Sequence, residues 1–105
     1  MARAQTAGAW SFGARSVEEA SLKARKLLQK ALASPANLRF EEACALARAF
    51  GFHLSRVSGS HHIFAHRDVR ELVNLQEVHG KAKPYQVKQL LALVERYNLS
   101  WGGEE

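Results

Sequence analysis

A glycine-containing turn followed by two histidines is the part of the sequence best suited to chemistry. Ser58, Gly59 and Ser60 precede His61 and His62, which begin a short run typical of a β-strand. Imidazole gains and loses a proton near neutral pH, so a histidine here could act as a general acid or base. Glycine also lets a ligand approach the backbone closely. The same residues suit ordinary polar positions at the start of a strand, and spacing alone does not separate the two interpretations.

The two histidines must point to opposite faces of such a strand, because side chains alternate along it. His61 then shares a face with Ile63, and His62 shares a face with Phe64. Only one of the pair can face a given site. Since Ile63 and Phe64 are both apolar, the alternation leaves open which face is buried.

Metal binding is the main alternative for the histidines, because the chain contains five of them. His62 and His66 would share a strand face, but four residues at roughly 3.3 Å each separate them by about 13 Å. That distance is too long for two ligands of one tetrahedral ion. The single cysteine, Cys44, removes zinc sites built on several cysteines, and the sequence has no glycine-rich phosphate loop. We therefore expect neither a metal nor a cofactor.

A second group of polar residues runs from the third predicted strand into the last helix. Ammonium groups beside tyrosine and amide side chains suit an RNA strand, because phosphates provide affinity and planar rings stack on bases. A solvated loop and the outer face of a helix explain the pattern equally well. The group consists of Asn74, Gln76, His79, Lys81, Lys83, Tyr85, Gln86 and Lys88.

Three helices are predicted around these residues. A first helix covers residues 16–34, since Ser16 opens a capping box and apolar residues recur at three- and four-residue steps. Asn37 is predicted to cap a second helix, and Gly51 ends it. Pro84 begins a last helix, because proline is tolerated in the first helical turn. One face of this last helix is lined by Val87, Leu90, Leu91, Val94 and Tyr97.

Between the second and last helices, short β-prone runs predict an antiparallel three-stranded sheet. The runs are His53–Val57, His61–His66 and Glu71–Gln76. Two helices can cover one face of such a sheet and bury a single core. The predicted fold class is therefore α+β, with the order α-β-β-β-α preceded by one extra N-terminal helix.

The composition is that of one small globular domain with a basic surface. The chain has 105 residues, 47% of them hydrophobic, and a formal charge of +5. This charge favours anionic partners, although many small proteins are basic for no specific reason. No apolar stretch approaches the roughly 20 residues of a membrane span, and a lone cysteine is typical of an intracellular chain. We expect a cytoplasmic protein with no membrane contact, organised as a flexible leader (1–15), the N-terminal helix (16–34), the main domain (37–101) and a tail (102–105).

Three stretches taken together resemble the HicA family of type II toxin–antitoxin systems. They are Gly59–Phe64, Leu72–Gln76 and Gly80–Gln86, and the resemblance spans about residues 37–99. Members of that family have a double-stranded-RNA-binding-like α-β-β-β-α fold, in agreement with the order obtained here from periodicity. The sequence departs from compact family members in its extra N-terminal helix and in the segment after the third strand.

The resemblance implies an mRNA interferase that cleaves single-stranded RNA without a metal and is neutralised by a HicB-type antitoxin. In the family motif Gly-Ser-x-His the last residue is catalytic, which corresponds to His62, and His61 occupies the variable place. As a hypothesis, His62 acts as a general base, the lysines neutralise phosphate charge, and Tyr85 or Phe64 stacks on a base. The predicted RNA contacts are Gly59, Ser60, His61, Phe64, Lys81, Lys83, Tyr85 and Lys88.

Two other functions fit the same residues. In the first alternative the chain is a non-catalytic RNA-binding module of the same fold, and His62 only contacts phosphate. In the second the chain is a protein-interaction unit, in which the N-terminal helix pairs with a second copy or with an antitoxin. The residues for such pairing would be Leu27, Leu28 and Leu32.

Overall fold

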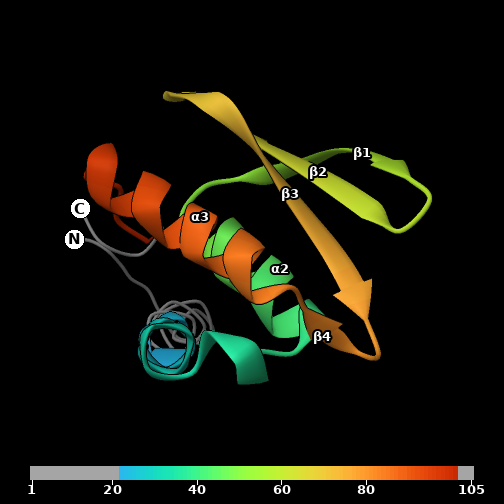
Figure 1. The fold of residues 1–105 in the computed structure, drawn as a ribbon. Coiled ribbons are helices and arrows are strands. Elements are labelled where there is room, and N and C mark those ends of the chain that lie inside the picture. Colours follow the sequence, from blue (N-terminus) through green and yellow to red (C-terminus); the bar gives the residue numbers. More distant parts are fainter. Residues whose placement is uncertain (1–21, 102–105) are drawn as a thin grey trace, which may run out of the picture.

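The computed structural model describes residues 22–101, and within them four antiparallel strands form one sheet in the order β1-β2-β3-β4. Two helices, α2 and α3, lie side by side on one face of this sheet (Figure 1). The predicted α+β fold, with helices flanking an antiparallel sheet and an additional N-terminal helix, is confirmed. The elements are α2 (Phe40–Ala49), β1 (His53–Ser58), β2 (His61–His66), β3 (Val69–Val78), β4 (Lys81–Ala82) and α3 (Pro84–Arg96).

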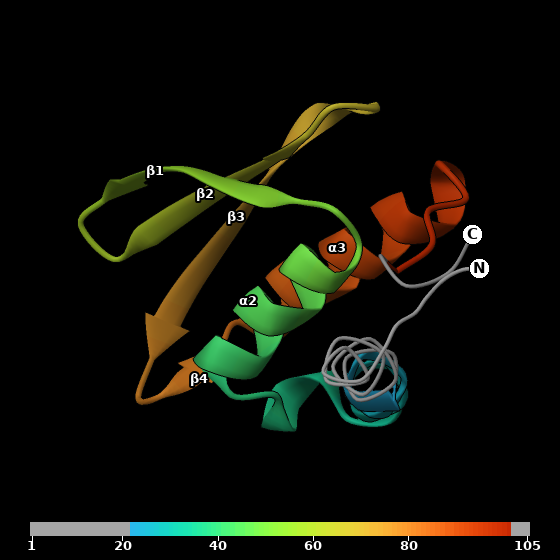
Figure 2. The same ribbon diagram turned by 180° about the vertical axis from the view of Figure 1, so that it is seen from behind.

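The N-terminal helix packs against the helical layer on the side away from the sheet (Figures 1 and 2). It is described over residues 22–33, so the predicted capping box at Ser16, the leader 1–15 and the tail 102–105 lie outside the described residues. Leu27 and Ala31 are buried in the common core, whereas Leu32 is 64% exposed. The prediction that Leu27 contacts a partner is therefore wrong, because its side chain packs within the domain.

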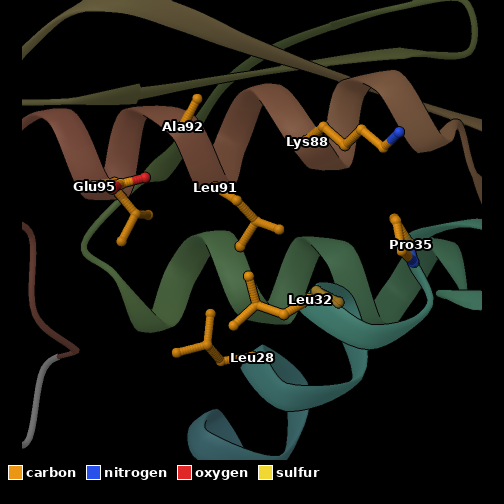
Figure 3. A pocket seen from close by; sticks show the side chains of 9 residues that line it. Leu28, Leu32, Pro35, Lys88, Leu91, Ala92 and Glu95 are labelled. Carbon is orange, nitrogen blue, oxygen red and sulfur yellow. The ribbon is translucent and has the colours of Figure 1, made fainter.

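An apolar groove remains between the N-terminal helix and α3 (Figure 3). Its volume is about 440 Å³, and Leu28 and Leu32 face Leu91 across it. Self-association through Leu28 and Leu32 stays a prediction.

The second helix begins later than the sequence predicts. Pro35–Asn37 form a short 3-10 helix, and the N-cap of α2 is Arg39. The Arg39 amide donates to Oε1 of Glu42 over 2.9 Å, so a carboxylate in the first turn satisfies this backbone donor. The predicted cap at Asn37 is wrong, because Asn37 ends the 3-10 turn. The predicted C-terminal stop is confirmed, since α2 ends at Ala49 and Gly51 has φ +95°.

Glu42 also joins the N-terminal helix to α2, because Lys30 Nζ donates to the same Oε1 atom over 2.8 Å. The hydrogen bonds from Lys30 and from the Arg39 amide lower the pKa of Glu42 below its ordinary value of 4.5. The resulting stabilisation is complete above pH 4.5 and is lost as the pH falls through the lower folded-state pKa.

Glu42→Gln is expected to reduce the free energy of unfolding by about 1 kcal/mol at pH 7, as the loss of a helix cap does. The difference in the free energy of unfolding between this variant and the unchanged chain should shrink as the pH is lowered. A protonated glutamate is uncharged and resembles glutamine. Urea unfolding followed by circular dichroism from pH 7 to pH 3 measures both effects. Glu95→Gln is the control, since the Glu95 carboxylate makes no hydrogen bond within the described part of the chain. A difference that stays constant over this pH range would contradict the assignment.

The sheet contains one strand more than predicted, counted over residues 22–101. His79 and Gly80 have positive φ values of 54° and 82°, and they reverse the chain so that β4 pairs with the end of β3. β4 has only two residues, which is too short for an alternating pattern to reveal. It matters for the site because the bridge between Arg39 and Lys81 fixes the start of α2 against the sheet.

The core lies between the sheet and the helices. Phe64, Val73 and Leu75 point from β2 and β3 toward α2 and α3, and all three are fully buried. The opposite face of the sheet carries Leu72, which is 52% exposed. None of the helices formed by residues 22–101 is long and apolar enough to cross a membrane.

Candidate active site

The turn between β1 and β2 delivers His62 to the helix-covered side of the sheet. Gly59 adopts φ +61° in this turn, a conformation that favours glycine. His62 pairs with Leu75 of β3 and lies on the same strand face as Phe64. Its ring meets the Phe40 ring edge-on, with the ring centroids 4.8 Å apart. The first residue of α2 therefore supports the imidazole from the side of the helical layer.

One nitrogen of His62 is engaged by the turn itself. Nδ1 lies 3.3 Å from the carbonyl oxygen of Ser60. A carbonyl oxygen can only accept a hydrogen bond, so this contact favours the tautomer with the proton on Nδ1. Nε2 then carries the lone pair, which is the arrangement that a general base requires.

His61 points to the other face of the sheet. Its Nδ1 lies 3.0 Å from the side-chain nitrogen of Asn74, so an amide on β3 orients this ring. The two adjacent histidines are thus held by different partners on opposite faces. Asn74 was predicted as part of a polar group, but its pairing with His61 depends on strand register, which the sequence leaves open.

Several element ends meet beside His62. The Phe40 amide donates to the Gly80 carbonyl over 3.0 Å, and Lys81 bridges Arg39, so β4 lies against the start of α2. α3 begins only two residues after β4, and both helices start at the end of the molecule that holds β4 (Figures 1 and 2). Helix N-termini carry partial positive charge, which Glu41 and Glu42 offset in the first turn of α2. The first turn of α3 contains no acidic residue, so the start of α3 is the helix end here that suits an anionic ligand.

Three of the predicted cationic and aromatic residues lie near these ends. Lys81 is exposed, and Lys83 Nζ lies 6.0 Å from the centre of the Tyr85 ring. Tyr85 is 62% exposed, so its ring is available for stacking. Lys88 does not join them: it lines the groove that faces the N-terminal helix, together with Leu28 and Pro35 (Figure 3).

Phe64 is buried in the core and is not part of the exposed site. It is 0% exposed, and the Arg48 guanidinium lies 5.6 Å from the centre of its ring. A ring enclosed by the core cannot stack on an RNA base, so the predicted RNA contact at this position is wrong. The physical reason is that β2 turns its Phe64 side toward α2 and α3, which alternation alone did not decide.

Other reactive groups are held apart from this region. Cys44 is buried in α2, and burial raises the pKa of its thiol, which keeps it protonated and a poor nucleophile. Within residues 22–101, no three histidine, cysteine or acidic side chains gather closely enough to hold a metal ion.

A comparison with protein-family models identifies the family. The model described as "HicA toxin of bacterial toxin-antitoxin" matches residues 40–95, which is more than half of the 105-residue chain. The chain belongs to the HicA toxin family. Comparison with curated proteins and with solved structures gives no significant match.

The HicA match begins at the first residue of α2 and ends one residue before the end of α3. It therefore contains the turn with His62, the whole sheet and both covering helices, and it leaves out the N-terminal helix. HicA toxins are generally ribonucleases that act beside an antitoxin. Membership thus implies an RNA substrate and an antitoxin partner for this chain.

Proposed function

We propose that this HicA-family chain is a metal-independent endoribonuclease that cleaves single-stranded mRNA in the cytoplasm and is neutralised by a HicB-type antitoxin. The observation that carries the proposal is the hydrogen-bond contact of the His62 ring. Its Nδ1 faces the Ser60 carbonyl, which leaves Nε2 available as a base within the Gly59-Ser60-His61-His62 motif. Lys81 and Lys83 in the β4 region provide positive charge on the side of the domain where β4 meets the start of α2.

In the proposed reaction, Nε2 of His62 takes the proton from a ribose 2′-hydroxyl. The 2′-oxygen then attacks the adjacent phosphorus, and the bond from phosphorus to the 5′-oxygen of the next nucleotide breaks. The departing 5′-oxygen takes a proton from solvent water, and the His62 imidazolium returns its proton to the solvent. The products are a 2′,3′-cyclic phosphate and a free 5′-hydroxyl. DNA has no 2′-hydroxyl and cannot react in this way.

Supporting roles follow from position. Lys81 or Lys83 would neutralise charge on the pentacoordinate phosphorus, and Tyr85 would stack on a flanking base. The backbone of Gly59 and Ser60 would pass close to the phosphate, because the turn is open to solvent. His61 would contact only RNA that continues around the turn to the far face of the sheet.

The proposal predicts that the purified chain cleaves RNA but not DNA of the same sequence. The reaction should proceed in EDTA, because no step requires a metal. Denaturing gel electrophoresis of end-labelled oligonucleotides, with enzymatic analysis of the product ends, should reveal cyclic phosphates. An RNA with a single 2′-O-methyl group at the cleavage site is the matched control and should stay intact there. Cleavage of DNA, or products with 5′-phosphate ends, would contradict the mechanism.

The runner-up function is a non-catalytic RNA-binding module. The same basic end of the domain and the exposed Tyr85 ring favour it as a second candidate. Binding of RNA in a filter assay, without cleavage over the same concentration range, would replace the first proposal by this one.

A further inference from the structure

Gln86 is a buried polar residue on a face of α3 that is otherwise apolar. It is 1% exposed and lies on the same helix face as Leu90 and Leu93, four and seven residues further along. Among residues 22–101 it is the only polar residue that is buried. A buried amide destabilises the fold unless it is hydrogen-bonded, so its partners are informative.

The first partner is the end of β3. Oε1 of Gln86 accepts from the Gln76 backbone amide over 2.8 Å. Gln76 lies just before the two residues of β3 that pair with β4, so the Gln86 carbonyl takes the place of a strand carbonyl. This bond completes the sheet edge, and its role is structural.

The second set of bonds leads to the candidate site. Nε2 of Gln86 donates to Oε1 of Gln76 over 3.2 Å and to the Tyr85 hydroxyl over 3.4 Å. Nε2 of Gln76 donates in turn to Oγ of Ser60 over 3.4 Å. The carbonyl of Ser60 is the group that faces Nδ1 of His62. Polar contacts therefore lead from the interior of the domain to the side chain of Ser60, and the backbone carbonyl of the same residue contacts the imidazole.

We propose that Gln76 and Gln86 are positioning residues that hold the turn before His62, and with it the tautomer and orientation of the imidazole. Through its bond to Tyr85, Gln86 also couples this turn to the exposed aromatic ring at the start of α3. The inference deepens the proposed ribonuclease function and rests on it for its effect on cleavage. Neither glutamine contacts the reacting atoms.

The structure supplies a variant that separates positioning from folding. Gln76→Met removes the side-chain bonds to Gln86 and Ser60 but keeps the backbone amide that completes the sheet edge. Gln76→Glu keeps an acceptor for Gln86 Nε2 and can accept the Ser60 hydroxyl proton, so it should restore the contact. Gln89→Met is the matched control, because Gln89 is exposed on α3 and makes no side-chain hydrogen bond within the described chain.

Gln76→Met is expected to lower kcat for RNA cleavage about 10- to 100-fold with little change in KM, as misplacement of a catalytic group does. Gln76→Glu should recover most of the rate, and Gln89→Met should leave it unchanged. A merely structural residue would instead lower the amount of folded protein, which thermal unfolding measures. Equal kcat values for Gln76→Met and the unchanged chain would overturn the proposal.

A second measurement does not depend on catalysis. Two-bond ¹H–¹⁵N NMR spectra of the His62 ring report the tautomer directly, and Gln76→Met and Ser60→Ala should both shift its nitrogen signals while Gln89→Met does not. Shifted His62 signals in a chain that cleaves no RNA would support the positioning role and overturn the ribonuclease proposal. Unchanged His62 signals in both variants would overturn the positioning role whatever the activity.

Discussion

Cleavage of RNA by the His62→Ala protein is expected to be about 10²- to 10⁴-fold slower than cleavage by the unchanged chain, the usual cost of removing a positioned general base. The reason is the geometry of the turn: Nδ1 is engaged by the Ser60 carbonyl, and only Nε2 can accept a proton. The His62 ring packs against Phe40, whereas the His66 ring packs against Phe52 at the other end of β2. Single-turnover cleavage of end-labelled RNA, with product ends analysed, measures the loss.

His53→Ala is the matched control for this variant. His53 lies exposed on the edge strand β1, and its removal should change the cleavage rate less than twofold, as at an ordinary surface site. The His62→Ala chain should unfold at a similar temperature to the unchanged chain and should still bind RNA, since the lysines and Tyr85 are intact. Cleavage by His62→Ala at the rate of the unchanged chain would remove His62 from the mechanism.

Local stereochemistry explains which elements were predictable from the sequence. Gly51 and Pro84 were placed correctly as the end of α2 and the start of α3, because each acts through its own backbone preference. The cap of α2 was misplaced because it depends on the Glu42 carboxylate, which accepts from the Arg39 backbone amide, rather than on a short polar side chain at the N-cap. Such a contact between two residues cannot be predicted from the preferences of single residues for the N-cap position.

The candidate site was predictable only in part, for a related reason. The Gly-Ser-x-His motif pointed to His62. Ile63 and Phe64 are both apolar, so the sequence did not show which face of β2 the helices cover and hence which face is buried. The contacts of Gln86 join residues ten positions apart and depend on the register of β3. One signal was present in the sequence: a glutamine occupied the apolar stripe of α3, four residues before Leu90, where a hydrophobic residue is expected.

Phe64→Ala is expected to reduce the free energy of unfolding by about 3–5 kcal/mol, because it leaves a cavity where a fully buried aromatic ring was. A small domain is typically stable by only about 5–15 kcal/mol, so much of the margin would be lost. Leu72→Ala is the control: it also truncates an apolar residue of the sheet, but on the exposed face, and it should cost less than about 1 kcal/mol. Urea unfolding at neutral pH compares the two.

The Phe64 and His62 variants together separate a packing role from a catalytic role on the same face of β2. Phe64→Ala should lose RNA cleavage only in proportion to the protein that is unfolded, so lowering the temperature should recover activity. His62→Ala should stay inactive at every temperature at which it is folded. If Phe64→Ala instead remained as stable as the unchanged chain and bound RNA more weakly, then the Phe64 ring would be accessible and the buried face of β2 would have to be reassigned.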